Sequence, residues 1–127
     1  MRLFCKVLII TTLLALFASC HRHEPEGVVK SFYGAYQNLD FEKAKDYCTP
    51  YMSQRINLIQ SGMNDGKKAF LQHKIKKQHI AVEEVNYNDA GTQAVVKVVF
   101  TAPDDSLTHV DYVTLEKCGE EWKVSNF

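Results

Sequence analysis

The spacing of apolar residues changes along this 127-residue chain, and the change limits the folds that it can adopt. From Glu26 to about residue 62, apolar residues recur every three or four positions, as on helices that pack along one side. Beyond residue 78 they recur every second position, as on strands. Helices precede strands, so the pattern predicts an α+β fold with antiparallel strands.

The helical part predicts three helices. Pro25 and Glu26 suit the start of the first, since proline fits the first helical position and an acid favours the positive end. Its apolar stripe contains Val28, Val29, Phe32, Tyr33 and Tyr36.

Two further helices follow the "NLD" that ends the first. One covers residues 41–48, with Asp40 as its N-cap. The other starts at Pro50, places Met52, Ile56 and Ile59 on one stripe, and stops at Gly62. The "NDG" after it predicts a turn, and "KKAFLQHKI" could form either a short helix or a loop.

The strand part predicts four strands. The run "HIAVEEVNYN" changes phase at Glu83–Glu84, which indicates a bulge or a bend. The run "TQAVVKVVFTA" is the clearest strand, with Ala94, Val96, Val98 and Phe100 on one face. "LTHVDYVTLEK" and "EEWKVSNF" predict a final hairpin across "CGE".

The first 19 residues have the layout of a secretory signal. Arg2 and Lys6 precede an apolar run over residues 7–17, and the small residues Ala18 and Ser19 precede Cys20. The run is about half of the ~20 residues that a transmembrane helix needs, which favours a cleaved signal over a permanent span.

"FASC" at residues 17–20 resembles the lipobox of bacterial lipoproteins, although Phe17 stands where leucine is commonest. The resemblance implies cleavage before Cys20 and acylation of its thiol, which would anchor the protein to a membrane in the bacterial cell envelope. The alternative is an ordinary signal, with Cys20 as a free or disulfide-bonded thiol. These boundaries predict a signal peptide over 1–19, a tether over 20–25 and one domain over 26–127.

The tether "HRHEPE" follows Cys20 and contains no apolar residue, so we expect a flexible segment. His21 and His23 lack a third ligand nearby, so we expect no metal site there.

The charge balance argues against a nucleic-acid partner. The chain has 15 basic and 15 acidic residues, and loss of Arg2 and Lys6 with the signal leaves a net charge of about −2. A local basic run could meet anionic lipid or an acidic partner, but most such runs are solvated faces. It contains Lys67, Lys68, Lys74, Lys76 and Lys77.

Four segments together resemble small bacterial lipoproteins of the DUF4878 type, within the NTF2-like (cystatin-like) superfamily. They are the "FYGAY" helix, "LDFEKAKDYCTP", the Val/Ala strand and the closing "VTLEKCGEEWKVSNF". The resemblance implies helices packed on a curved four-stranded antiparallel sheet that forms a cone with a hydrophobic interior. NTF2-like proteins include isomerases, hydratases, transport factors and association modules. The lipoprotein branch implies no cofactor and no assigned chemistry.

His109 and Asp111 are the candidate catalytic pair. They are two residues apart on a strand and share a face with Val113 and Leu115. If that face lines the cone, the pair could act as an acid/base site; otherwise it lies at a solvated strand end. Tyr33, Tyr36 and Tyr87 could line the same cavity, or pack in the core with their hydroxyls at its rim.

Cys48 and Cys118 could form a disulfide outside the cytoplasm. Nothing in the sequence brings them together, and Cys48 also suits the role of a small buried apolar residue. A catalytic thiol is disfavoured, because no motif supplies the histidine and orienting group that it needs.

Three hypotheses for function follow. The first is a non-enzymatic lipoprotein of the cell envelope that binds an unknown protein or a small apolar ligand. The second is a small isomerase or hydrolase that uses His109 and Asp111. The third is a domain that forms a homodimer through its sheet.

Overall fold

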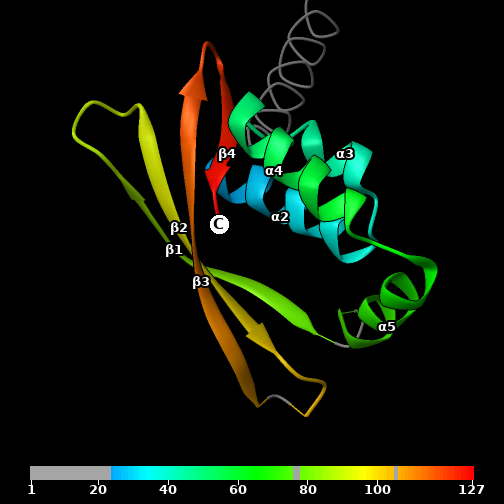
Figure 1. Ribbon diagram of the computed structural model, residues 1–127. Helices are drawn as coiled ribbons and strands as arrows, with labels where there is room; N and C mark the ends of the chain where they lie inside the picture. The colour runs from blue at the N-terminus through cyan, green and yellow to red at the C-terminus, as the bar shows by residue number, and fades with distance from the viewer. Residues whose placement is uncertain (1–23, 76–77, 105) are drawn as a thin grey trace, which may run out of the picture.

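The computed structural model describes residues 24–75, 78–104 and 106–127. The expected signal, Cys20, His21 and His23 lie outside the described residues, as do Lys76 and Lys77. The chain forms an α+β fold, as the pattern predicted, in which the helices gather on one side of the sheet (Figure 1). The helices are α2 (Pro25–Gln37), α3 (Phe41–Lys45), α4 (Pro50–Ser61) and α5 (Asp65–Ile75). The strands are β1 (His79–Tyr87), β2 (Gln93–Thr101), β3 (Leu107–Cys118) and β4 (Glu121–Asn126).

Helix α2 supplies the largest share of the helical core. Pro25 stands at its first position, so the helix takes the last residue of the expected tether. Its stripe is buried as predicted, except that Tyr36 is half-buried. The helix ends in a Schellman motif, in which Leu39 and Asp40 donate backbone hydrogen bonds to Tyr36 and Ala35. Leu39 has a φ of 55°, which is unusual for leucine, and its side chain is buried in the core.

Helix α3 is shorter than the expected helix over 41–48. Asp40 caps it as predicted, accepting a hydrogen bond of 3.3 Å from the Lys43 amide. After Lys45 the chain tightens into turns, in which the Asp46, Tyr47 and Cys48 amides bond to carbonyls three residues earlier. The segment then pairs with the edge strand β4. Val124 donates to the Tyr47 carbonyl at 2.7 Å, and Thr49 donates to the Val124 carbonyl at 2.9 Å. This long-range pairing replaces the last turn of the expected helix.

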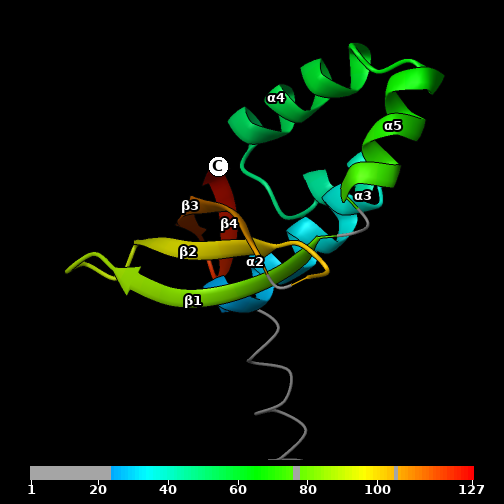
Figure 2. The same ribbon diagram turned by 90° about the horizontal axis from the view of Figure 1, so that it is seen from below.

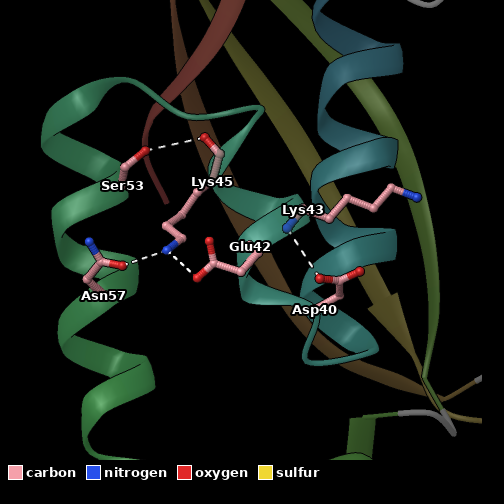
Figure 3. Close-up of polar contacts among 6 residues, drawn as sticks. All are labelled: Asp40, Glu42, Lys43, Lys45, Ser53 and Asn57. Atoms are coloured by element: carbon pink, nitrogen blue, oxygen red, sulfur yellow. Dashed lines mark hydrogen bonds and ion pairs between the residues drawn. The ribbon is translucent and has the colours of Figure 1, made fainter.

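Polar contacts join α3 to α4 (Figure 3). The Lys45 Nζ lies 2.6 Å from Glu42 Oε1 and 2.7 Å from Asn57 Oδ1. The Ser53 hydroxyl donates to the Lys45 carbonyl at 3.3 Å. The bonds to Asn57 and from Ser53 join the two helices, beside the core where Ala44, Met52 and Ile56 are buried.

Helices α4 and α5 begin at side-chain caps. The Thr49 hydroxyl accepts from the Met52 amide at 3.3 Å, ahead of Pro50, and α4 stops at Gly62 as predicted. The predicted turn at "NDG" is wrong, because Asn64 Oδ1 accepts from the Lys67 amide at 2.8 Å and starts α5 there. The segment left open as helix or loop is therefore helical.

The four strands form one antiparallel sheet in the order β1-β2-β3-β4, and the sheet is not closed. The predicted irregularity at Glu83–Glu84 is confirmed by a register shift between Val82 and Glu84. The face of β2 that carries Ala94, Val96, Val98 and Phe100 is buried. We call this the inner face, because it packs with α2 in the core. Figure 2 shows α5 standing farther from the sheet than α2 does.

Candidate functional site

His109 and Asp111 lie on the inner face of β3. They pair with Phe100 and Val98 of β2, and Val113 and Leu115 continue the same face into the core. The shared face predicted from alternation is therefore confirmed. The His109 Nε2 lies 3.6 Å from Asp111 Oδ2, with side chains 45% and 37% exposed. That distance is longer than a hydrogen bond. The two side chains form an ion pair only when His109 is protonated.

Tyr33 reaches the same carboxylate from α2. Its hydroxyl donates to Asp111 Oδ2 at 3.4 Å, although 78 residues separate the two in the chain. Burial raises the pKa of Tyr33 well above its usual range, and the neighbouring Asp111 carboxylate raises it further. Tyr33 therefore stays protonated in the folded protein and acts as a hydrogen-bond donor.

Aromatic contacts fix the rings in this cluster. The His109 ring stacks on Phe100, with centroids 4.1 Å apart and an interplanar angle of 11°. Phe100 in turn meets the Tyr33 ring edge-on at 5.3 Å. A carboxylate with a tyrosine donor on one side and an imidazole on the other can accept or pass a proton, and this is the chemistry that the arrangement offers.

The three candidate tyrosines do not share one cavity. Tyr36 is half-buried near Tyr33; it stacks on Phe32 at 5.7 Å, and burial raises its pKa. Tyr87 is 55% exposed and packs on Trp122 at 5.8 Å. It pairs with Ala94, about 20 Å along β2 from the Phe100 that touches Tyr33. Tyr87 and Tyr33 therefore lie at different places along the sheet.

Sequence reasoning missed Phe127 in this cluster. The terminal ring lies 5.2 Å from Phe32 and 5.5 Å from Tyr36. Alternation from Val124 would point Asn126 inward, but the register shift opposite Thr114 and Leu115 changes the phase and turns Phe127 inward instead. Such a shift depends on the partner strand, so β4 alone gave no signal of it.

Both described cysteines are free thiols, so the candidate disulfide between Cys48 and Cys118 is not formed. Cys48 is buried, and its thiol donates to the Ala44 carbonyl at 3.3 Å. Burial raises the pKa of the Cys48 thiol to about 12. A buried, protonated thiol is a poor nucleophile, and Cys48 acts as the small apolar residue that the sequence suggested.

A surface hollow of about 920 Å³ lies where α4 meets β3 and β4, outside the inner face. Arg55 donates to Asn126 Oδ1 across it at 3.0 Å, and the exposed ring of Tyr51 stands at its rim. Its other lining residues are Thr49, Pro50, Glu116 and Ser125. The hollow contains the cationic donor Arg55 and the anionic acceptor Glu116, so it suits a polar molecule.

Other features expected from the sequence contribute little to a site. Lys67 and Lys68 are exposed on α5, and the side chains of the remaining lysines of the basic run are not described. Among the described residues, no group of His, Cys, Asp or Glu could hold a metal ion. No helix among them is long and apolar enough to cross a membrane.

We predict that Tyr33→Phe weakens the dependence of stability on alkaline pH. Because the folded pKa of Tyr33 is raised, its contribution to stability is complete below its unfolded value near 10 and is lost as the pH rises above that. Wild-type unfolding free energy should therefore fall by up to about 1.4 kcal/mol more per pH unit than that of Tyr33→Phe. Denaturant unfolding at a series of pH values measures this.

The matched control is Tyr51→Phe, because the Tyr51 ring is 66% exposed. It should keep the wild-type slope. Equal slopes in wild type and Tyr33→Phe would contradict the burial of the Tyr33 hydroxyl.

Comparison of the chain with family models, with curated proteins and with solved structures gives no match. The argument for function therefore depends on the sequence and on the geometry above.

Proposed function

We propose that this chain is a lipid-anchored protein of the bacterial cell envelope whose domain is a non-enzymatic binding module. The observation that carries the anchor is the position of Pro25, a buried residue at the start of α2 only five residues after Cys20. The domain thus has a buried residue only a few positions after the lipobox-like "FASC", as expected if Cys20 becomes the first residue of the mature protein.

The binding role is supported by how the aromatic side chains are used. Phe32, Tyr33 and Tyr36 fill the core, so the inner face offers little room for a buried substrate. The hollow that Tyr51 and Arg55 line is open, polar and outside the core. A polar ligand or a partner segment in this hollow fits the described surface better than the small apolar ligand considered from sequence.

The acid/base alternative has weaker support. Tyr33, Asp111 and His109 do meet, but the His109–Asp111 contact of 3.6 Å is longer than a hydrogen bond. Neither residue lines the hollow at Arg55. We therefore give this cluster a structural role, in which Tyr33 ties α2 to β3.

We also infer an NTF2-like arrangement for the domain. Its support is the order of the elements, with helices first and a meander of four antiparallel strands after them. The bulge in β1 adds to this support, since a bulge bends a strand and gives a sheet curvature.

Acylation of Cys20 tests the anchor. In a bacterial host, wild-type protein should partition into the detergent phase, and mass spectrometry should find a diacylated cysteine at its amino terminus. Cys20→Ser should remain uncleaved and carry no acyl chain. Mature protein with an unmodified Cys20, or with cleavage elsewhere, would contradict the proposal.

Binding at the hollow is tested on protein extracted from its own membrane. Native mass spectrometry should detect a non-covalent adduct that is lost in Tyr51→Ala and in Arg55→Ala. Both changes remove exposed or half-exposed side chains, so the free energy of unfolding should change by less than about 0.5–1 kcal/mol. Tyr112→Ala is the control, because Tyr112 is similarly exposed and does not line the hollow. An adduct that persists in both variants, or no adduct at all, would contradict the binding role.

A further inference from the structure

Three side chains form an exposed patch at one end of the sheet, which we call the end patch: Tyr87, Lys117 and Trp122. The Tyr87 and Trp122 rings lie 5.8 Å apart, and the Lys117 Nζ lies 5.8 Å from the centre of the Trp122 ring. Tyr87 is 55% exposed and Trp122 is half-buried. Three different strands thus present two amphipathic rings and a flexible cation on one surface.

The end patch lies near the start of the folded domain. Val28, in the first turns of α2, and Trp122 line the same surface hollow of about 470 Å³. Figure 1 shows the start of α2 beside β4, with the β3–β4 turn at the same end of the sheet and α5 at the opposite end. The chain that leads to Cys20 therefore joins the domain on the side of the end patch.

The short link to Cys20 limits how far this side can move from a membrane. Pro25 is the fifth residue after Cys20, and an extended chain spans at most about 3.3–3.6 Å per residue. If Cys20 is acylated, as the proposed function requires, the start of α2 stays within about 18 Å of the lipid surface. A tether this short also raises the local concentration of lipid to about the millimolar range. A contact of low affinity is then enough to keep the end patch on the membrane.

The chemistry of the end patch fits the boundary between lipid and water. Tryptophan and tyrosine favour this boundary, because each ring has an apolar body and a polar group. Lysine can lay its apolar stem along the acyl region and keep its amine in water. Charges of both signs lie beside Trp122, since Glu121 and Lys123 line the same hollow and Lys117 contacts the ring. Anionic headgroups therefore gain no clear advantage.

We propose that the end patch rests on the membrane that holds Cys20, with the Trp122 and Tyr87 rings at the lipid–water boundary. The domain then lies on the bilayer in a fixed orientation. Helix α5, at the opposite end of the sheet, remains directed away from the lipid.

Trp122 is the only tryptophan in the chain, so its fluorescence reports on this contact directly. The experiment uses full-length acylated protein in phosphatidylcholine vesicles, with and without lipids brominated near the headgroup end of their acyl chains. Bromine quenches tryptophan only at close range. We expect brominated lipid to reduce the emission roughly twofold, as for a ring at the lipid–water boundary. Addition of phosphatidylglycerol should change the result little.

A double variant, Trp122→Phe with Phe70→Trp, is the control. It moves the tryptophan to an exposed position on α5, where bromine should leave the emission unchanged. Unquenched Trp122 in protein whose Cys20 is shown by mass spectrometry to be acylated would overturn this inference and leave the anchor standing. An unmodified Cys20 would remove the tether and overturn both.

Discussion

The contact between α2 and the inner face of the sheet organises this domain. Phe32 is fully buried at its centre and meets the rings of Tyr33, Tyr36 and Phe127, with centroids 5.2–5.7 Å apart. Helix α2 thereby joins the start of the described domain to Phe127, the last residue of the chain. A domain of about 100 residues has a small stability margin, so a single aromatic contact of this size accounts for much of it.

The two edges of the sheet are protected in different ways. Residues 47–49 pair with β4, which shortens α3 and covers that edge. The β1 edge has no such cover in the described residues, but it carries a bulge and the charged Glu83, which lies 3.2 Å from Lys97. Charges and bulges on an edge strand discourage pairing with other chains. The cover on β4 also builds the wall of the polar hollow at Arg55.

Local sequence patterns predicted the helices and strands, whereas contacts between distant residues determine where some of them end and which side chains meet. The α2 stripe, the bulge in β1 and the shared face of His109 and Asp111 follow from periodicity, which a single strand or helix displays on its own. The end of α3 and the inward turn of Phe127 depend on pairing with distant residues. So does the hydrogen bond from Tyr33 to Asp111, because α2 must first be placed on β3. The hollow at Arg55 is lined by residues of α4 and of the sheet, and no motif in the helical or the strand part of the sequence indicated it.

If α2 has this central role, the cost of removing the Phe32 ring measures it. Denaturant unfolding should show that Phe32→Ala loses about 3–5 kcal/mol of stability or does not fold. The same change at Phe70, whose ring is 66% exposed, should cost less than about 0.5 kcal/mol. A loss at Phe32 no larger than the loss at Phe70 would contradict the account.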